Sequence, residues 1–308
     1  MLKIAEIMKL LIQLTPSFIF IFFCTVPAWI VLKLYNNKIK RRKSPINIEL
    51  LRNAGDSIQE KINNINDEII FNLFLLPIIP IIVYSLALSN FIPPQKGISA
   101  LMIIIYISTI LLSTIYFGKK VYALVNERNK LRLGLECEKA IGQCLSVLLK
   151  YGFNVYHDLQ ADNFNIDHIA VGPTGVFSIE TKGRSKLLKA ENNNWKVDFD
   201  GTRLIFPGWE ETKPVKQTIN QSKWLKKFIQ DTTGEKINVT PVIALPGWYI
   251  TRKEKSSILT INGKSIDFIA KGARVLTDKQ IQSISFQIKS KCIDNSPKSY
   301  QKIAQQSH

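Results

Sequence analysis

The stretch FNIDHIAVGPTGVFSIETKG, residues 164–183, decides the fold of the C-terminal part of this 308-residue chain. Its two arms, residues 165–171 and 176–182, are rich in Ile, Val and Phe, which favour extended structure. Between the arms, the sequence GPTG at residues 172–175 is typical of a tight turn. The stretch therefore predicts a β-hairpin.

Charged side chains interrupt these apolar arms. Asp167 would cost several kcal/mol if it were buried without a partner. Glu180 and Lys182 are two residues apart, so they point to the same face of the sheet, while Thr181 faces the other way. In a hairpin closed by this turn, Asp167 falls across from Glu180 or one step off it. Two carboxylates and an ammonium should therefore gather on one face.

Adjacent carboxylates repel each other unless a cation or a proton lies between them. Mg²⁺ is a hard cation that binds one or two carboxylates together with water and phosphate oxygens. A lysine beside it can hold an attacking water or stabilise a pentavalent phosphate. This grouping is typical of metal-assisted phosphodiester hydrolysis. Taken alone, Asp167, Glu180 and Lys182 fit a solvated salt-bridge face on an edge hairpin as well as they fit a metal site.

The wider sequence resembles a known family. The D-x(12)-E-x-K spacing on a hairpin resembles the PD-(D/E)xK nuclease core, and the longer string resembles the nuclease-related domain (NERD) family. That family has a G-x-x-G-E helix start, an N-I-D-H-I-V-V-G-P-x-G-V-F-V-I-E-T-K hairpin and a later P-x-x-Q helix. The matching stretches here are GLECE (134–138), NIDHIAVGPTGVFSIETKG (165–183) and KPVKQ (213–217).

The resemblance implies a nuclease with a restriction-endonuclease-like α/β fold, in which helices flank a mixed sheet. Asp167 and Glu180 match the metal-binding carboxylates, and the resemblance implies that they hold Mg²⁺ or Mn²⁺ with the Thr181 carbonyl as a third ligand. Lys182 matches the motif lysine, which positions the attacking water. The implied substrate is nucleic acid, with DNA expected.

Two more site residues follow from the resemblance. Glu138 matches the glutamate of the first helix, which acts through a water-mediated metal contact or as a base. Gln217 matches the glutamine of the later helix, which orients the substrate phosphate or the lysine. The chain departs from the family pattern at Cys137, Ala170 and Lys213, and none of these changes removes a charged catalytic group. We expect the neighbouring His168 and His157 to pack or to form hydrogen bonds rather than to catalyse.

Regular structure is also expected elsewhere in the C-terminal part. We predict helices over residues 133–151, 214–231 and 277–291, and strands over residues 153–159, 195–199, 203–206, 239–245, 258–261 and 266–270.

The N-terminal part contains three apolar stretches without charge. They cover 23 residues from Leu10, 27 from Ile69 and 22 from Gly97. A helix needs about 20 apolar residues to cross a bilayer, so we predict spans near 12–32, 69–91 and 99–118. The first run is too long for a signal peptide, and no small-residue cleavage site follows it.

Lysine and arginine counts predict the orientation of these spans. The loop NNKIKRRKS after the first span carries five basic residues, whereas the turn SNFIPPQKG between the other two carries one. Basic loops stay on the cytoplasmic side. We therefore expect a multi-pass protein of the plasma (inner) membrane with its N-terminus outside and its C-terminal domain in the cytoplasm.

The predicted organisation has six parts. They are a first transmembrane helix (1–35), a basic and heptad segment (36–68), a transmembrane hairpin (69–118), a helical linker (119–132), a nuclease-like domain (133–292) and a loose tail (293–308).

A heptad seam is predicted within the second of these parts. Apolar residues and a glycine recur there at steps of three and four, at Ile48, Leu51, Gly55, Ile58, Ile62, Ile65 and Ile69. Such a seam predicts self-association or a helical stalk; the alternative is a separate surface helix with one apolar stripe.

The charge balance favours an anionic partner. The chain has 41 Lys and Arg against 24 Asp and Glu, a net charge of +17, which suits nucleic acid or the membrane surface. Its motifs include no P-loop, kinase signature or zinc ribbon. The main hypothesis is a membrane-anchored nuclease. The alternatives are a non-catalytic nucleic-acid or protein binding module at the membrane, and a purely structural membrane protein.

Overall fold

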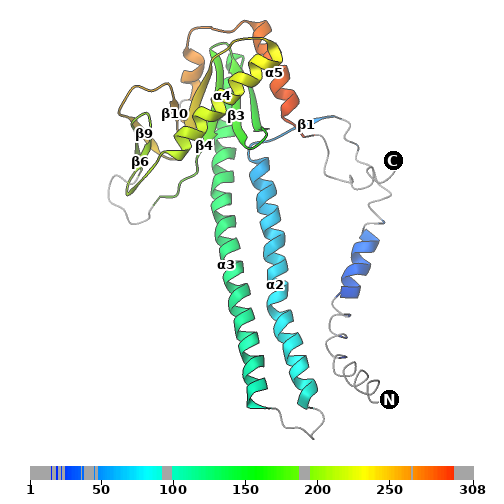
Figure 1. Ribbon diagram of the computed structural model, residues 1–308. Helices are drawn as coiled ribbons and strands as arrows, with labels where there is room; N and C mark the ends of the chain where they lie inside the picture. The colour runs from blue at the N-terminus through cyan, green and yellow to red at the C-terminus, as the bar shows by residue number, and fades with distance from the viewer. Residues whose placement is uncertain are drawn as a thin grey trace. The chain divides into compact units, whose positions relative to one another are not determined.

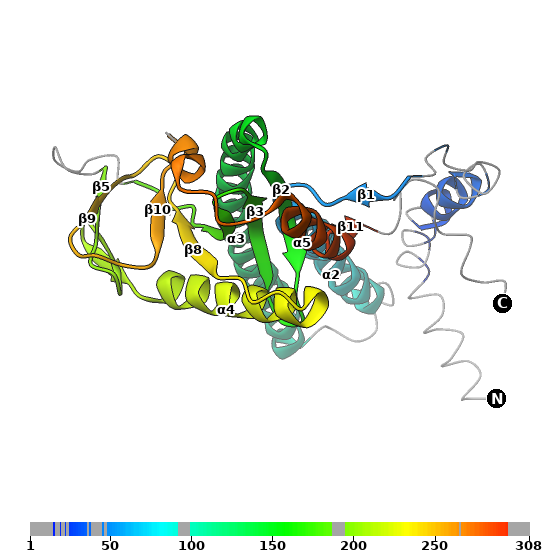
Figure 2. The same ribbon diagram turned by 90° about the horizontal axis from the view of Figure 1, so that it is seen from above.

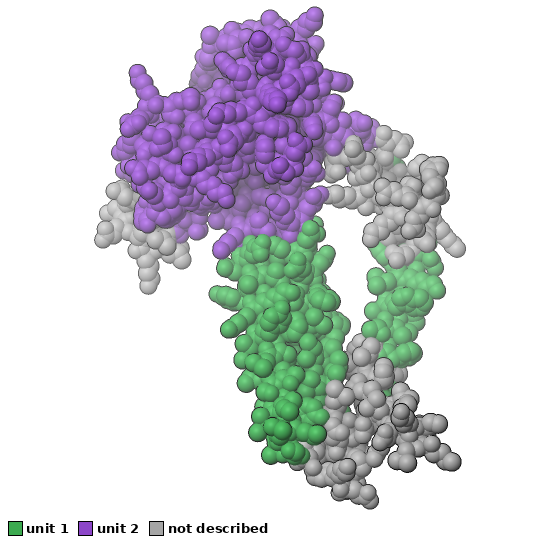
Figure 3. All heavy atoms as spheres, in the orientation of Figure 1, with its two compact units in different colours: residues 1–47, 63–128, 297–308 green, residues 48–62, 129–296 purple. Residues whose placement is uncertain are grey.

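The computed structural model describes residues 15, 19, 22, 25–35, 37, 45, 48–91, 99–186, 195–264 and 266–294. The chain divides into two units, shown in Figure 3: unit 1 is residues 1–47, 63–128 and 297–308, and unit 2 is residues 48–62 and 129–296. About half of the first predicted span (12–32), nearly all of the basic loop after it and the turn at 92–98 lie outside the described residues, while residues 25–32 of that span are helical.

Unit 1 contains a short apolar helix, Thr25–Tyr35, and most of two long helices that continue into unit 2. The two long helices are α2 (Asp56–Phe91), which contains Pro77 and Pro80, and α3 (Ala100–Leu145) (Figure 1). Both are long and apolar enough to cross a membrane, and of their most apolar windows only 11% is buried in α2 and 0% in α3. Residues 69–91 and 100–118 of the second and third predicted spans are therefore helical, and few of their described apolar side chains are buried.

A mixed five-stranded sheet forms the centre of unit 2, with the order β10-β8-β4-β3-β2. Its strands are β2 (Asn154–Gln160), β3 (Asn165–Gly172), β4 (Gly175–Thr181), β8 (Val239–Ala244) and β10 (Leu259–Ile261). Strand β3 pairs antiparallel with both β2 and β4, whereas β8 pairs in parallel with both β4 and β10.

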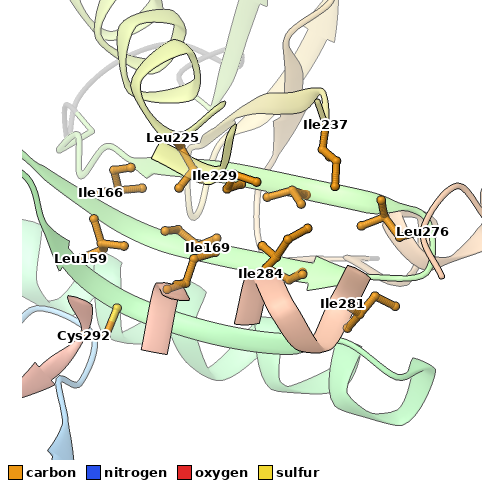
Figure 4. Packing of buried hydrophobic residues seen from close by; sticks show 13 residues of the cluster. Leu159, Ile166, Ile169, Leu225, Ile229, Ile237, Leu276, Ile281, Ile284 and Cys292 are labelled. Atoms are coloured by element: carbon orange, nitrogen blue, oxygen red, sulfur yellow. The ribbon is translucent and has the colours of Figure 1, made fainter. Parts of the chain in front are cut away.

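Helices cover both faces of this sheet. On one face, α4 (Lys213–Thr233) and α5 (Asp278–Lys291) bury an apolar cluster; Figure 4 shows Leu225 and Ile229 of α4 and Ile284 of α5 around Ile169 of β3. On the other face, the end of α3 packs with two 3-10 helices, η1 (Ser146–Tyr151) and η2 (Ile266–Lys271). Figure 2 shows α4 running along the sheet. The expected α/β architecture is confirmed.

A second, four-stranded sheet lies beside α4. Its order is β7-β6-β5-β9, with β5 (Lys196–Phe199), β6 (Leu204–Phe206), β7 (Trp209–Glu211) and β9 (Tyr249–Arg252). The strands predicted at 195–199 and 203–206 are confirmed as β5 and β6, which pair antiparallel. Sequence analysis did not predict β7 or β9, because both are short and depend on pairing with β6 and β5.

The predicted hairpin at residues 164–183 is confirmed as β3 and β4. Gly172 pairs with Gly175, so Pro173 and Thr174 form the turn. Gly175 has φ of 135°, which only glycine adopts readily. The expected helices over 133–151, 214–231 and 277–291 are present as well, the first as the end of α3 followed by η1.

Two other predictions are wrong. The strand expected at 266–270 is the 3-10 helix η2, in which Ile266 and Ile269 are buried three residues apart rather than in alternation. The heptad seam is not helical from Ile48, because α2 begins only at Asp56 and Gly55 has φ of 81°.

Two short strands, one in the predicted heptad segment and one in the predicted tail, also pair with each other. Leu50–Leu51 form β1, which pairs antiparallel with β11 (Ile293–Asp294) at the start of the predicted loose tail. Residues from Asn295 onward lie outside the described part of the chain. Residues 48–62 of the basic and heptad segment and residues 293–294 of the tail thus belong to unit 2.

Candidate active site

The β3–β4 hairpin sets two carboxylates side by side. His168 pairs with Ile179, and the same register one residue further places Asp167 opposite Glu180. The backbone N–H of Thr181 donates a hydrogen bond to Asp167 Oδ2 at 2.7 Å. This is the placement that the turn and the strand periodicity predicted.

Helix α4 contacts Glu180 of this acidic pair, both directly and through Lys182. Lys182 Nζ donates hydrogen bonds to Glu180 Oε1 and, at 3.1 Å, to Gln217 Oε1. Gln221 Nε2 donates to Glu180 Oε2 at 2.5 Å and to the Asn165 carbonyl at 2.8 Å. Gln217 and Gln221 are one helical turn apart, so one face of α4 contacts both the lysine and the glutamate.

Gln221 is a site residue that sequence analysis did not assign. Its side chain is buried and donates to a carboxylate that we predicted as a metal ligand. The only signal in the sequence was its four-residue spacing from Gln217. That spacing shows a shared helix face but cannot show what the face touches.

Glu138 comes to the same place from α3. Its side chain is 7% exposed, and burial, with repulsion from Asp158 and Glu180, raises the pKa of Glu138 to about 8. The positive charges of Lys182 and Lys61 oppose this rise. Burial and the nearby carboxylates Glu180 and Glu138 also raise the pKa of Asp167 well above its usual range, against the Thr181 N–H and Lys182.

All six residues predicted for the site line one cleft of about 660 Å³ in unit 2. They are Glu138, Asp167, Glu180, Thr181, Lys182 and Gln217. Three elements supply them: α3, the hairpin with the residue after it, and α4. The residues span 80 positions of sequence, so their convergence is a property of the fold.

The cleft contains a further acid that sequence analysis missed. Asp158 of β2 is 2% exposed and has φ of 51°, an uncommon left-handed conformation for a non-glycine residue. The pairs on either side of it, His157 with His168 and Leu159 with Ile166, place it opposite Asp167. Asp158 lines the cleft, so a third strand contributes a carboxylate to it.

Two residues far upstream hold Asp158: Arg52 neutralises its charge, and Ser57 donates hydrogen bonds to it. Arg52 contacts Asp158 Oδ2 through Nε at 2.8 Å and Nη2 at 2.7 Å. The backbone N–H and the hydroxyl of Ser57 donate to the same oxygen, each at 2.8 Å, and Asn165 Nδ2 donates to Asp158 Oδ1 at 3.1 Å. Because Arg52 lies 106 residues from Asp158, no local pattern could have predicted the pair.

The two histidines do not line this cleft. Their Nδ1 atoms are 2.9 Å apart in a hydrogen bond between β2 and β3. Burial lowers the pKa of His157, and burial together with His157 lowers the pKa of His168 well below its usual range. The expectation that both histidines pack and form hydrogen bonds is confirmed.

A metal ion would need oxygen ligands here. Among the described residues, no group of three or more His, Cys, Asp or Glu side chains is arranged to hold a metal ion. The facing carboxylates of Asp167 and Glu180 nevertheless offer hard oxygen donors at the open cleft, and each carboxylate has about four lone-pair sites. Their mutual repulsion, which contributes to the raised pKa of Asp167, would be relieved by a cation.

The sequence of this region also matches a family model. Residues 133–246 match the model of the nuclease-related domain, NERD, and this range contains all six predicted site residues. The match supports the similarity to that family that the hairpin string indicated. No curated protein and no solved structure matches the chain.

Proposed function

We propose that this chain is a membrane-anchored, metal-dependent nuclease that hydrolyses phosphodiester bonds of nucleic acid, with DNA as the expected substrate. One observation carries the proposal: Asp167, Glu180 and Lys182 converge on one cleft within the region that matches the nuclease-related domain. The arrangement is that expected of a PD-(D/E)xK site. The adjacent carboxylates suit a divalent cation, and the lysine suits a negatively charged phosphate.

Asp167 and Glu180 would hold the Mg²⁺ or Mn²⁺ ion, with the Thr181 carbonyl as a third ligand. When bound, such an ion polarises the phosphate and activates water for attack. Lys182 orients the attacking water, and its Nζ atom is itself fixed by Glu180 and Gln217. Glu138 would act through a water-mediated contact with the metal or as a base. As a base it would accept the proton of the attacking water in its ionised form, which the positive charge of a nearby cation favours by lowering its pKa.

The proposed membrane anchor rests on the apolar surfaces of α2 and α3. The large apolar side chains exposed there include Phe71, Phe74, Ile104 and Leu112, each at least 60% exposed. Contact of such side chains with water is unfavourable, and the hydrocarbon layer of a membrane would remove it. With the basic loops on the cytoplasmic side, the nuclease domain would act inside the cell at the plasma (inner) membrane.

The test uses the full chain, purified in detergent and incubated with labelled single- and double-stranded DNA and RNA. Cleavage is measured with Mg²⁺, with Mn²⁺ and with a chelator. We expect metal-dependent cleavage that is lost in Lys182→Met and retained in the matched control Lys186→Met, since Lys186 is exposed and does not line the cleft.

Three results would contradict the proposal. Cleavage that persists in the chelator would exclude metal dependence, and equal rates in Lys182→Met and Lys186→Met would exclude the site. Tight, salt-sensitive binding without cleavage under any condition would favour the alternative, a non-catalytic nucleic-acid binding module at the membrane.

A further inference from the structure

The cleft has a second wall, formed by residues outside the region that matches the nuclease-related domain. Ser57, Ile58 and Lys61 of α2 face it together with Lys130 and Leu131 of α3. All of these residues belong to unit 2. The family match begins only at residue 133, so this wall is not part of the matched domain.

Close packing holds the start of α2 against α3. A Cβ added at Gly55 would lie 2.4 Å from Leu135 Cδ1, and one added at Gly142 would lie 2.9 Å from the Ala54 Cβ. Neither contact leaves room for a larger side chain. The backbone of residues 54–55 therefore lies directly on α3 beside Glu138.

The buried ion pair holds the same segment to the sheet. Arg52 and Ser57 together make four contacts of 2.7 or 2.8 Å with Asp158 Oδ2. Ser57 Oγ also accepts a hydrogen bond from Asn165 Nδ2 at 2.6 Å. The first turns of α2 are thus fixed to both the helix and the strand that carry the candidate catalytic acids.

This fixed wall carries positive charge opposite an acidic floor. Lys61 and Lys130 are exposed and line the cleft, and neither forms a salt bridge within the described part of the chain. The floor contains the carboxylates of Glu138, Asp167 and Glu180. Two cations held at the edge of such a cleft suit a ligand whose negative charges are spaced along a chain.

We infer that Lys61 and Lys130 bind the sugar-phosphate backbone of the nucleic acid that enters the cleft. The inference rests on the proposed nuclease function and names a contact surface for its substrate. Lysine ammonium groups bind phosphate as point charges, without reading the base sequence. The wall therefore contributes affinity and orientation, while the hairpin and α4 carry the chemistry.

The test measures binding by the full chain in detergent, with a labelled DNA duplex and a single strand, in chelator so that the DNA stays intact. Lys61→Ala, Lys130→Ala and the double variant are compared with Lys139→Ala. Lys139 is also an exposed lysine of α3, but it does not line the cleft. Each affinity is measured over a series of salt concentrations.

Each wall variant should bind about tenfold more weakly than Lys139→Ala, and the slope of log affinity against log salt should fall by about one per lysine removed. The double variant should lose about two units of slope. With Mg²⁺, the wall variants should raise KM for cleavage more than they lower kcat, since the lysines act in binding.

Two outcomes would overturn the inference and can be told apart. If wild type cleaves nucleic acid but the wall variants bind with the affinity and salt slope of Lys139→Ala, the wall does not contact substrate and the nuclease proposal stands. If wild type neither binds nor cleaves nucleic acid, the wall inference and the proposed function fail together.

Discussion

The hairpin at residues 164–183 and the segment at residues 48–62 line the same cleft, but they are encoded in different ways. The hairpin's strands, its turn and its acid-acid-lysine face all follow from neighbouring residues. The upstream segment is positioned by Arg52 and Ser57, whose partner Asp158 lies more than 100 residues away. The acid-acid-lysine face of the hairpin is thus encoded by neighbouring residues, whereas one wall of the cleft depends on long-range contacts.

Substitutions in the two regions should also have different effects. Changes in the hairpin should impair the reaction while the fold persists, because its acids face the cleft. Changes in the upstream segment should act through stability or substrate affinity, because its polar residues are used in packing and at the cleft edge. Variants of the two regions can therefore test whether the regions differ in this way.

The largest effect is expected for Asp167→Asn. Asparagine has nearly the same shape and can still accept the hydrogen bond from the Thr181 N–H, but it removes the charge proposed to bind the metal. Since a bound metal contributes several kcal/mol to the transition state, cleavage should fall by about 10³-fold or more. Initial cleavage rates and circular dichroism measure the loss and the retained fold. A rate within tenfold of wild type would show that the hairpin does not carry the chemistry.

The second effect is on stability. Arg52→Met leaves Asp158 buried without its cation, which should destabilise unit 2 by about 3 kcal/mol or more. Thermal unfolding followed by tryptophan fluorescence reports mainly on this unit, which contains four of the five tryptophans, including the buried Trp248. Arg132→Met, at an exposed position of α3, is the control. Adding Asp158→Asn to Arg52→Met should recover part of the loss, and equal midpoints for Arg52→Met and Arg132→Met would show that the ion pair does not hold the segment.

A smaller effect is expected at α4. Gln217→Leu removes one of the two side chains that hold Lys182, and loss of such a supporting contact typically costs about 10–100-fold in activity. The loss should appear in kcat more than in KM, because the lysine acts on the reacting groups. Gln230→Leu, at an exposed position of the same helix, should leave both constants unchanged. A loss confined to KM would instead assign Gln217 to substrate binding alone.

The smallest effect concerns the opposite face of the hairpin. Burial depresses the pKa of His168 in the folded state, so below the usual value of about 6.5 the unfolded chain binds more protons. His168 should therefore make stability fall as pH drops below that value, by at most about 1.4 kcal/mol per pH unit.

The matched comparison for this effect is His168→Leu, which removes the titrating group. Its thermal midpoint should depend less on pH between 5 and 7 than that of wild type. The raised pKa values of Glu138 and Asp167 act in the opposite direction and are present in both proteins. His157, whose pKa is also lowered, acts in the same direction as His168, so the variant keeps some of the pH dependence. The same pH dependence in both would show that protonation of His168 does not affect folding.

Sequence patterns predicted most of unit 2 because the relevant signals are local. Glycine and proline mark the hairpin turn, and the helices predicted over 214–231 and 277–291 are present as α4 and α5. The Thr277 capping box, with Gln280 at its third helical position, also begins α5 where the pattern indicated. All six residues predicted for the site converge on the cleft.

The misassigned segments lacked such signals. The three-and-four spacing around Ile48 suggested a helix, but Gly55 takes a left-handed conformation and Leu50 and Leu51 pair with Ile293–Asp294. At residues 266–270, alternation and a three-residue repeat both fit the apolar residues, and packing against the sheet favours the 3-10 helix. Only tertiary contacts decide such cases.

The most direct test of the account is Mn²⁺ binding to the full chain in detergent, measured by the loss of the free-ion electron paramagnetic resonance signal. Asp167→Asn is compared with Asp162→Asn, which changes an exposed carboxylate that lines the same cleft. We expect about one bound Mn²⁺ per chain in wild type and in Asp162→Asn, and loss of this site in Asp167→Asn. Equal binding by the two variants, or no stoichiometric binding by wild type, would contradict it.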